Sequence, residues 1–177
     1  MNKSKLLLIT IFSLLLGFSC TENKKPLSDK EIKKYKKPLE NVNKYLVEKD
    51  AEIIGSYAKR RNWDMQTTES GLWYMIYKNG TGQKAENGMI ARVNYHVSLL
   101  DGTFCYSTDS LGPEDFRIGH STAEQGLQEG IILMKIGGKA RFILPPHLAH
   151  GLLGDADKIP LRATIIYDVE LLNLFEN

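Results

Sequence analysis

The residue types that most often carry catalytic or metal chemistry are few in this chain and stand apart. Its four histidines are His96, His120, His147 and His150. Only His147-x-x-His150 has a spacing that could bring two imidazoles to one ion, and two ligands fall short of the sets that hold zinc. No neighbour in sequence would activate Cys105, so we interpret it as a small buried apolar residue. No metal site is predicted.

The elements that must position any site begin after Trp63, where apolar and polar residues start to alternate. The pattern predicts strands at 71–77, 90–99, 139–144 and 164–174, and a short helix at 122–130. Five or six antiparallel strands and one helix are expected in all, which defines an α+β domain over residues 66–177. By alternation alone, Tyr95 and Tyr167 would be core residues of two of these strands.

Residues 28–65 predict a helical stalk before this domain. Ser28 and Glu31 have the spacing of a capping box. An apolar stripe follows at helical steps, at Ile32, Tyr35, Leu39, Val42 and Leu46, and resumes at Ile53 and Tyr57. Pro38 predicts a kink or a break. The stripe could pack on the domain or pair with a second copy of the chain as a homodimer, and the pattern does not choose between them.

Residues 1–20 have the composition of an export signal. Lys3 and Lys5 precede an apolar run over residues 6–16, and small residues follow. The run is short for a bilayer-spanning helix, so we expect a leader that is removed.

The end of the leader, LGFSC at residues 16–20, resembles a bacterial lipobox. This likeness implies a signal peptide over 1–19, lipidation of Cys20, a short tether over 20–27 and a lipoprotein anchored to a membrane on its periplasmic side. Which of the two membranes receives the anchor is not indicated. Phe18 is bulkier than the residue usual at its position, so an ordinary cleaved leader is the alternative.

Charge is distributed unevenly along the chain. The net charge is +2, with 42% hydrophobic and 25% charged residues, as in ordinary globular proteins. Basic residues prevail in residues 21–61, whereas acidic residues outnumber basic ones in residues 62–177. A net negative domain disfavours a phosphate backbone as its ligand, so no nucleic-acid partner is expected.

Three stretches, in this order and spacing, resemble FKBP-type peptidyl-prolyl cis-trans isomerases. They are VNYHVSLLDG at 93–102, GLQEGIILMKIGGKARF at 126–142 and AHGLLGDADKIPLRATIIYDVELL at 149–172. The likeness extends over about residues 66–174 and implies the FKBP fold, a sheet wrapped around one short helix. The leader, the basic stalk and the residues at 105, 106 and 150 further resemble the gliding-motility-associated isomerase lipoproteins of Bacteroidota.

The resemblance implies an apolar cavity that acts on X-Pro bonds without a nucleophile and without a cofactor. The barrier to rotation is about 18–20 kcal/mol because the amide is conjugated, so a catalyst needs to favour the twisted state. The positions that would act on the rotating bond are Tyr95, Phe116, Leu127, His150 and Tyr167. Those that would contact the bound chain are Cys105, Tyr106, Ala123, Glu124 and Ile159.

Several of these residues depart from the family pattern. Cys105 replaces a usual phenylalanine, Tyr106 a usual aspartate, and His150 a tyrosine whose hydroxyl often reaches the ligand. Leu127 replaces a frequent indole and keeps an apolar floor with less aromatic area.

Three functions remain open at this stage. The first is isomerisation of proline bonds in exported or envelope proteins, with proline-containing polypeptides as partners. The departures motivate the second, a proline-segment-binding chaperone with little turnover. The third is a structural component of an envelope machine, in which the stalk and the lipid do the essential work.

Overall fold

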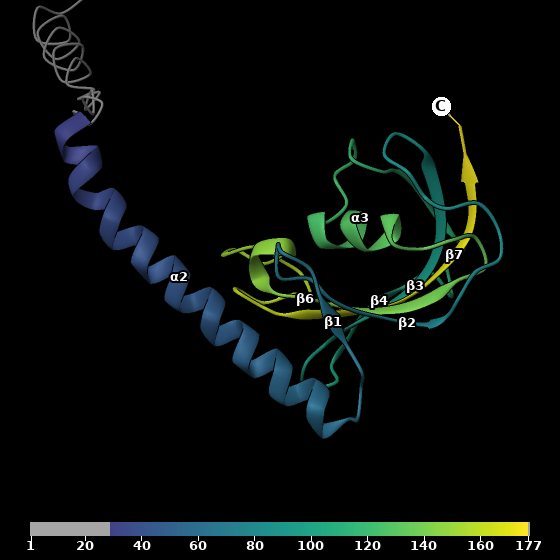
Figure 1. Cartoon of the computed structure of the whole chain (residues 1–177), viewed down its shortest axis with the longest axis horizontal. Coiled ribbons are helices and arrows are strands. Elements are labelled where there is room, and N and C mark those ends of the chain that lie inside the picture. The colour runs from purple at the N-terminus through teal and green to yellow at the C-terminus, as the bar shows by residue number, and fades with distance from the viewer. Residues whose placement is uncertain (1–28, 177) are drawn as a thin grey trace, which may run out of the picture. The chain divides into compact units, whose positions relative to one another are not determined.

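The computed structural model describes residues 29–176, drawn in colour in Figure 1. The expected leader, the lipidation site Cys20 and the tether lie outside the described residues. The described part of the chain divides into two compact units, with the boundary between Asn41 and Val42. Within residues 29–176, no helix has both the length and the apolar character needed to cross a membrane.

Helix α2 (Asp29–Arg60) passes through Pro38 without interruption, so of the kink or break expected at this residue, the break is wrong. A proline inside a helix removes one N–H donor and leaves the carbonyl four residues earlier without its partner. Here that carbonyl belongs to Lys34, which is exposed, so water can bond it.

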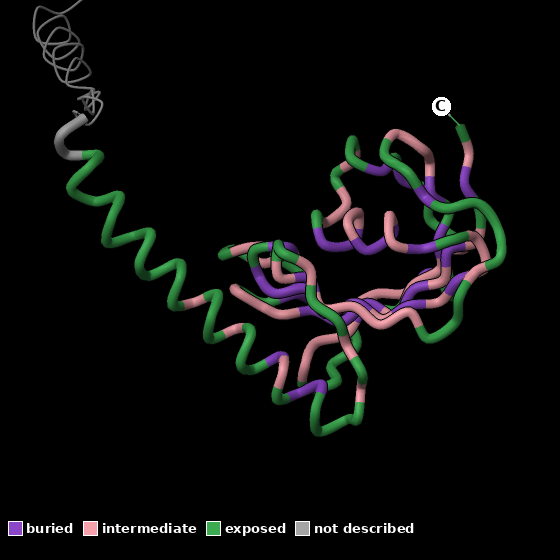
Figure 2. Tube along the Cα trace, viewed as in Figure 1, coloured by how far each residue is buried: buried purple, intermediate pink, exposed green. Residues whose placement is uncertain are grey.

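The apolar stripe of α2 has two environments. In the first unit, Ile32, Tyr35 and Leu39 are exposed. Near the end of the helix, in the second unit, Ile54 and Tyr57 are buried against Ile143 and Ile166 of the sheet. Figure 2 shows this change from exposed to buried along the helix. The stripe was expected to resume at Ile53, but it resumes one residue later, because Ile54 is fully buried and Ile53 is exposed.

The second unit contains a seven-stranded antiparallel sheet. Its strands are β1 (Gln66–Thr67), β2 (Trp73–Lys78), β3 (Ile90–Leu99), β4 (Phe104–Ser107), β5 (Glu114–Arg117), β6 (Lys139–Leu144) and β7 (Ile165–Phe175). The order is β1-β2-β6-β7-β3-β4, with β5 also paired to β3. β3 and β7 pair along their whole length, from Ile90 opposite Phe175 to Leu99 opposite Ile165.

Helix α3 (Gln125–Ile132) lies against the concave face of this sheet, as Figure 1 shows. Leu127 and Ile131 are buried in the core between the helix and the sheet. Gly126 and Gly130 allow the close approach, because a Cβ at Gly126 would lie 2.5 Å from Cγ of Leu144 and one at Gly130 2.5 Å from Cε2 of Phe142. A short 3₁₀ helix, η1 (Pro146–Leu148), follows β6.

Alternation along β6 and β7 gives the sheet two buried faces. Phe142 and Tyr167 point to the core under α3, whereas Ile143 and Ile166 point to the end of α2. The expected α+β architecture, a sheet around one short helix after a long N-terminal helix, is confirmed. The sheet has seven strands rather than five or six, because it includes the two-residue β1.

Candidate active site

A cavity of about 320 Å³ opens between the N-terminal end of α3 and the sheet. Residues from β3, β4, β5, β7, α3 and the loop after η1 converge on it. Its lining consists of Tyr95, Tyr106, Glu114, Thr122, Ala123, Glu124, Leu127, His150, Asp155 and Tyr167. Seven of the ten residues predicted for the site therefore line one cavity.

The rings of Tyr95 and Tyr167 form one wall of the cavity. Their centroids lie 5.4 Å apart at an interplanar angle of 69°, an edge-to-face arrangement that fixes both rings. Leu127 is almost completely buried and contributes an apolar surface from α3. Flat and aliphatic surfaces of this size suit a small apolar ring.

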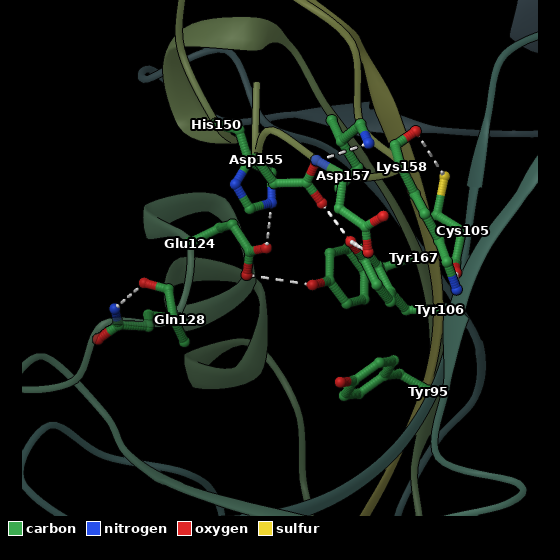
Figure 3. Close-up of polar contacts among 12 residues, drawn as sticks. Tyr95, Cys105, Tyr106, Glu124, Gln128, His150, Asp155, Asp157, Lys158 and Tyr167 are labelled. Atoms are coloured by element: carbon green, nitrogen blue, oxygen red, sulfur yellow. Dashed lines mark hydrogen bonds and ion pairs between the residues drawn. The ribbon is translucent and has the colours of Figure 1, made fainter. Parts of the chain in front are cut away.

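Glu124 caps the N-terminal end of α3 and contacts two other lining residues. Its Oε2 accepts a hydrogen bond of 3.1 Å from the Tyr167 hydroxyl. Its Oε1 lies 2.8 Å from Nε2 of His150, and this contact is an ion pair when the imidazole is protonated. Figure 3 shows Glu124 between these two side chains. The carboxylate thus ties the helix to β7 and to the loop after η1.

Asp155 holds the loop after η1 in place. It accepts hydrogen bonds from the Tyr106 hydroxyl and from the backbone N–H groups of Asp157 and Ile159, the latter two at 2.9 and 2.8 Å. Burial alone would raise the pKa of Asp155, but these hydrogen bonds and the nearby His150 outweigh it and lower that pKa to about 2. The hydrogen bond to Asp155, followed by burial, raises the pKa of Tyr106 to about 12.

Tyr95 pairs with a carboxylate of its own. Its hydroxyl donates to Oε2 of Glu114 on β5 at 2.5 Å. Burial first, and then this hydrogen bond, raises the pKa of Tyr95. Burial and the charge of Glu124 likewise raise the pKa of Tyr167. The phenols of the cavity are therefore neutral donors near neutral pH.

Three predicted site residues lie behind the cavity surface, in the buried core. They are Cys105, Phe116 and Ile159. Cys105 is fully buried, and this burial raises the pKa of its thiol. The neighbouring Tyr106 lines the cavity, whereas Cys105 does not.

Sequence reasoning missed Thr122, Glu114 and Asp155. Asp155 had a local signal, because an aspartate followed two residues later by Asp157 can form an Asx turn through its side chain. No local sequence signal marked Glu114, since its role depends on the pairing of β5 with β3, which brings it near Tyr95.

The histidines do not converge on an ion. Nε2 of His147 lies 2.9 Å from the carbonyl oxygen of Ser70, whereas His150 faces Glu124. Among the described residues, no three His, Cys, Asp or Glu side chains are grouped as metal ligands.

A sheet curved around one short helix, with a tyrosine-walled cavity between them, is the arrangement of FKBP-type peptidyl-prolyl cis-trans isomerases. The model of this family matches residues 81–172, so the chain belongs to the family.

Among its relatives, the FKBP-type isomerase FkpA of Aeromonas hydrophila is 36% identical over 159 residues, which cover 82% of this chain and 58% of the relative. FkpA of Escherichia coli K12 is 30% identical over 165 residues, 86% of this chain and 59% of the relative. This chain thus spans less than two thirds of the length of both. The crystal structure of Escherichia coli FkpA superposes with a TM-score of 0.61 at 27% identity, covering 99% of this chain and 83% of that one.

Proposed function

We propose that the chain catalyses cis-trans isomerisation of X-Pro peptide bonds. The observation that carries the proposal is the cavity between α3 and the sheet, walled by Tyr95 and Tyr167 and floored by Leu127. The apolar faces of these three side chains bind the proline ring and remove water from the planar amide, while the carbonyl is left free to turn. The reaction needs no bond to be made or broken.

The residues of the cavity divide this work. The two tyrosine rings are fixed edge to face and by their hydroxyl bonds, so they hold the prolyl ring in one orientation. The N–H of Glu124, at the start of α3, belongs to the helix N-terminal groups that lack partners within the helix. It can donate to a substrate carbonyl and so favour one bound geometry of the chain.

The test is an isomerisation assay on the purified chain from residue 21 onward, across several residues preceding proline. Acceleration that is lost in Tyr167→Ala and kept in Tyr45→Ala supports the enzyme, because Tyr45 is an exposed tyrosine on α2. No acceleration by folded protein contradicts it.

We propose further that the protein is a lipoprotein whose lipid on Cys20 anchors it to a membrane, facing the periplasm, where it acts on exported or envelope proteins. The lipobox-like LGFSC and the leader before it support this. Cells fed an alkyne analogue of palmitate should label the wild type and not Cys20→Ser. Labelling of Cys20→Ser would contradict lipidation at this residue.

Participation in gliding motility is part of the same proposal and is supported by the resemblance to gliding-associated lipoproteins. In a gliding bacterium, deletion of the gene should slow colony spreading, and Tyr167→Ala should reproduce the defect if isomerisation is what motility requires. A structural role predicts instead that deletion of residues 28–61 is more harmful than any cavity substitution.

A proline-segment-binding chaperone with little turnover is the second candidate. The contact between His150 and Glu124 inside the cavity favours it, because fixed polar groups there can hold a bound segment. Such a chaperone should suppress aggregation of a proline-containing client whose refolding is not limited by proline isomerisation, and an isomerase should not.

A further inference from the structure

Three tyrosine–carboxylate pairs surround the cavity, and each joins two different elements. Tyr95 of β3 donates to Glu114 of β5, and Tyr167 of β7 donates to Glu124 before α3. The third pair is Tyr106 of β4 with Asp155 of the loop after η1. Figure 3 shows the second and third pairs around one opening. All six side chains line the cavity.

Little positive charge opposes these three carboxylates. His150 is the one basic residue in the lining of the cavity. Lys158 keeps its positive charge nearby, with its Nζ 4.8 Å from the centre of the Tyr106 ring and bonded to the carbonyl oxygen of Cys105, but it does not line the cavity, so the three carboxylates outnumber the cations around it. The neutral phenols leave the carboxylate charge in place, and the lowered pKa of Asp155 keeps that residue ionised. The wall therefore presents net negative charge to whatever enters.

We propose that the cavity selects prolines that have a lysine or an arginine as a direct neighbour in the chain. This deepens and rests on the proposed isomerase function. A prolyl ring against Leu127 and Tyr167 places the adjacent residue at the mouth, where Glu114 is exposed and Asp155 is half-buried. A cationic side chain there meets carboxylates, and an acidic one meets repulsion.

The preference should act on binding more than on the rotation itself. A charge on the residue after the proline keeps its distance from the wall while the carbonyl before the ring turns, so in that series it stabilises the bound substrate and the twisted state alike. The expected signature is a lower KM for the lysine peptide at nearly constant kcat. Because the mouth is open to solvent, the preference should weaken as ionic strength rises.

The experiment compares pentapeptides that differ only in lysine, glutamine or glutamate beside the proline, placed before it in one series and after it in another. Exchange rates are measured by NMR without a coupling protease. We expect kcat/KM for the better lysine peptide to exceed that of its glutamate counterpart about fivefold at low salt. Glu114→Gln should reduce this ratio to about twofold, whereas Glu86→Gln, the same change at an exposed residue outside the cavity, should preserve it.

The outcomes separate this inference from the function on which it rests. Equal acceleration of lysine and glutamate peptides overturns the preference and leaves the isomerase standing. No acceleration of any peptide overturns the isomerase, and the affinities of the same peptides, measured by titration, then decide the preference. Equal affinities overturn it, and so does a Glu114→Gln ratio equal to that of the wild type.

Discussion

At the scale of single residues, Asp155 shows how one carboxylate organises the cavity. It accepts the Tyr106 hydroxyl and two backbone N–H groups of its own loop. These bonds favour the ionised form and hold the pKa of Asp155 at about 2, below its ordinary value of 3.8. The ionised carboxylate therefore stabilises the fold above about pH 4, and this contribution is lost as the pH falls towards 2.

Asp155→Asn should consequently lower the free energy of unfolding at pH 7, and this loss should shrink as the pH falls through about 2. Solvent at the cavity mouth screens the charge, so we expect a loss of about 1 kcal/mol at pH 7. Urea denaturation at pH 7, 4 and 2 measures it. Asp64→Asn, at an exposed position outside the cavity, is the matched control and should show no such pH trend. A difference between wild type and Asp155→Asn that persists unchanged at pH 2 would contradict the assignment.

At the scale of elements, the contact of α3 with β6 depends on the absence of a side chain at Gly130. Alanine normally stabilises the interior of a helix relative to glycine by about 1 kcal/mol. At Gly130 the added Cβ would lie 2.5 Å from Cε2 of Phe142, and Phe142 is fully buried and cannot move aside. Overpacking should therefore make alanine destabilising at this position, although it usually stabilises a helix relative to glycine.

We expect Gly130→Ala to destabilise the domain by about 2 kcal/mol. Gln125→Ala is the control, because Gln125 is an exposed residue of the same helix and should change stability little. Thermal and urea denaturation followed by circular dichroism give both values. A stabilised Gly130→Ala variant would show that the helix can lift from the sheet without cost.

The loop after η1 is fastened to α2 by an ion pair. Nη2 of Arg162 donates to Oδ2 of Asp50 at 2.8 Å. Arg162 has a φ of 54°, in the left-handed region that costs a side-chain-bearing residue about 1 kcal/mol. The ion pair and the strained backbone therefore act in opposite directions at one residue.

Two substitutions at position 162 separate these effects. Arg162→Ala loses the ion pair and keeps the strain, whereas Arg162→Gly loses the pair and relieves the strain. We expect the glycine variant to be more stable than the alanine variant by about 0.5–1 kcal/mol in urea denaturation. Asp50→Asn, which removes only the charge, should cost about 0.5 kcal/mol. An alanine variant as stable as the glycine variant would refute strain at this residue.

At the scale of the whole molecule, the sequence was informative where a pattern ran long enough to repeat. The predicted strands at 90–99 and 139–144 match β3 and β6 in their bounds. β5 has four residues and β1 two, too few for a period of two to be recognised. These short strands form because β3 and β2 offer them partners, which no local pattern reveals.

The candidate site, too, was predictable from the sequence only in part. Apolar lining residues such as Leu127 and Tyr167 lie in motifs and could be predicted with their positions. The tyrosine–carboxylate pairs could not, because each joins residues from different elements, as Tyr167 and Glu124 do across 43 positions. Such pairs depend on the pairing of the strands and on the placement of α3.

The exposed apolar stripe of α2 is the surface of the first unit for which we most expect a binding partner. Ile32, Tyr35 and Leu39 are 47%, 54% and 61% exposed, and they lie on one side of a regular helix. Exposing large apolar side chains in such a row to water is unfavourable in free energy, so we expect another apolar surface to cover them. A second copy of the same stripe is one such surface, so the expectation that the stalk pairs as a homodimer can be tested directly.

Leu39→Glu should dissociate this dimer, because it places a carboxylate in the centre of the apolar row. Asn41→Glu introduces the same side chain on the opposite side of the helix and should leave the dimer intact. Light scattering of the purified chains should give twice the monomer mass for the wild type and Asn41→Glu, and the monomer mass for Leu39→Glu. The thermal unfolding of the second unit should be the same in all three, since Leu39 lies outside that unit. A wild type that is monomeric at micromolar concentration would mean that a surface other than a second copy covers the stripe.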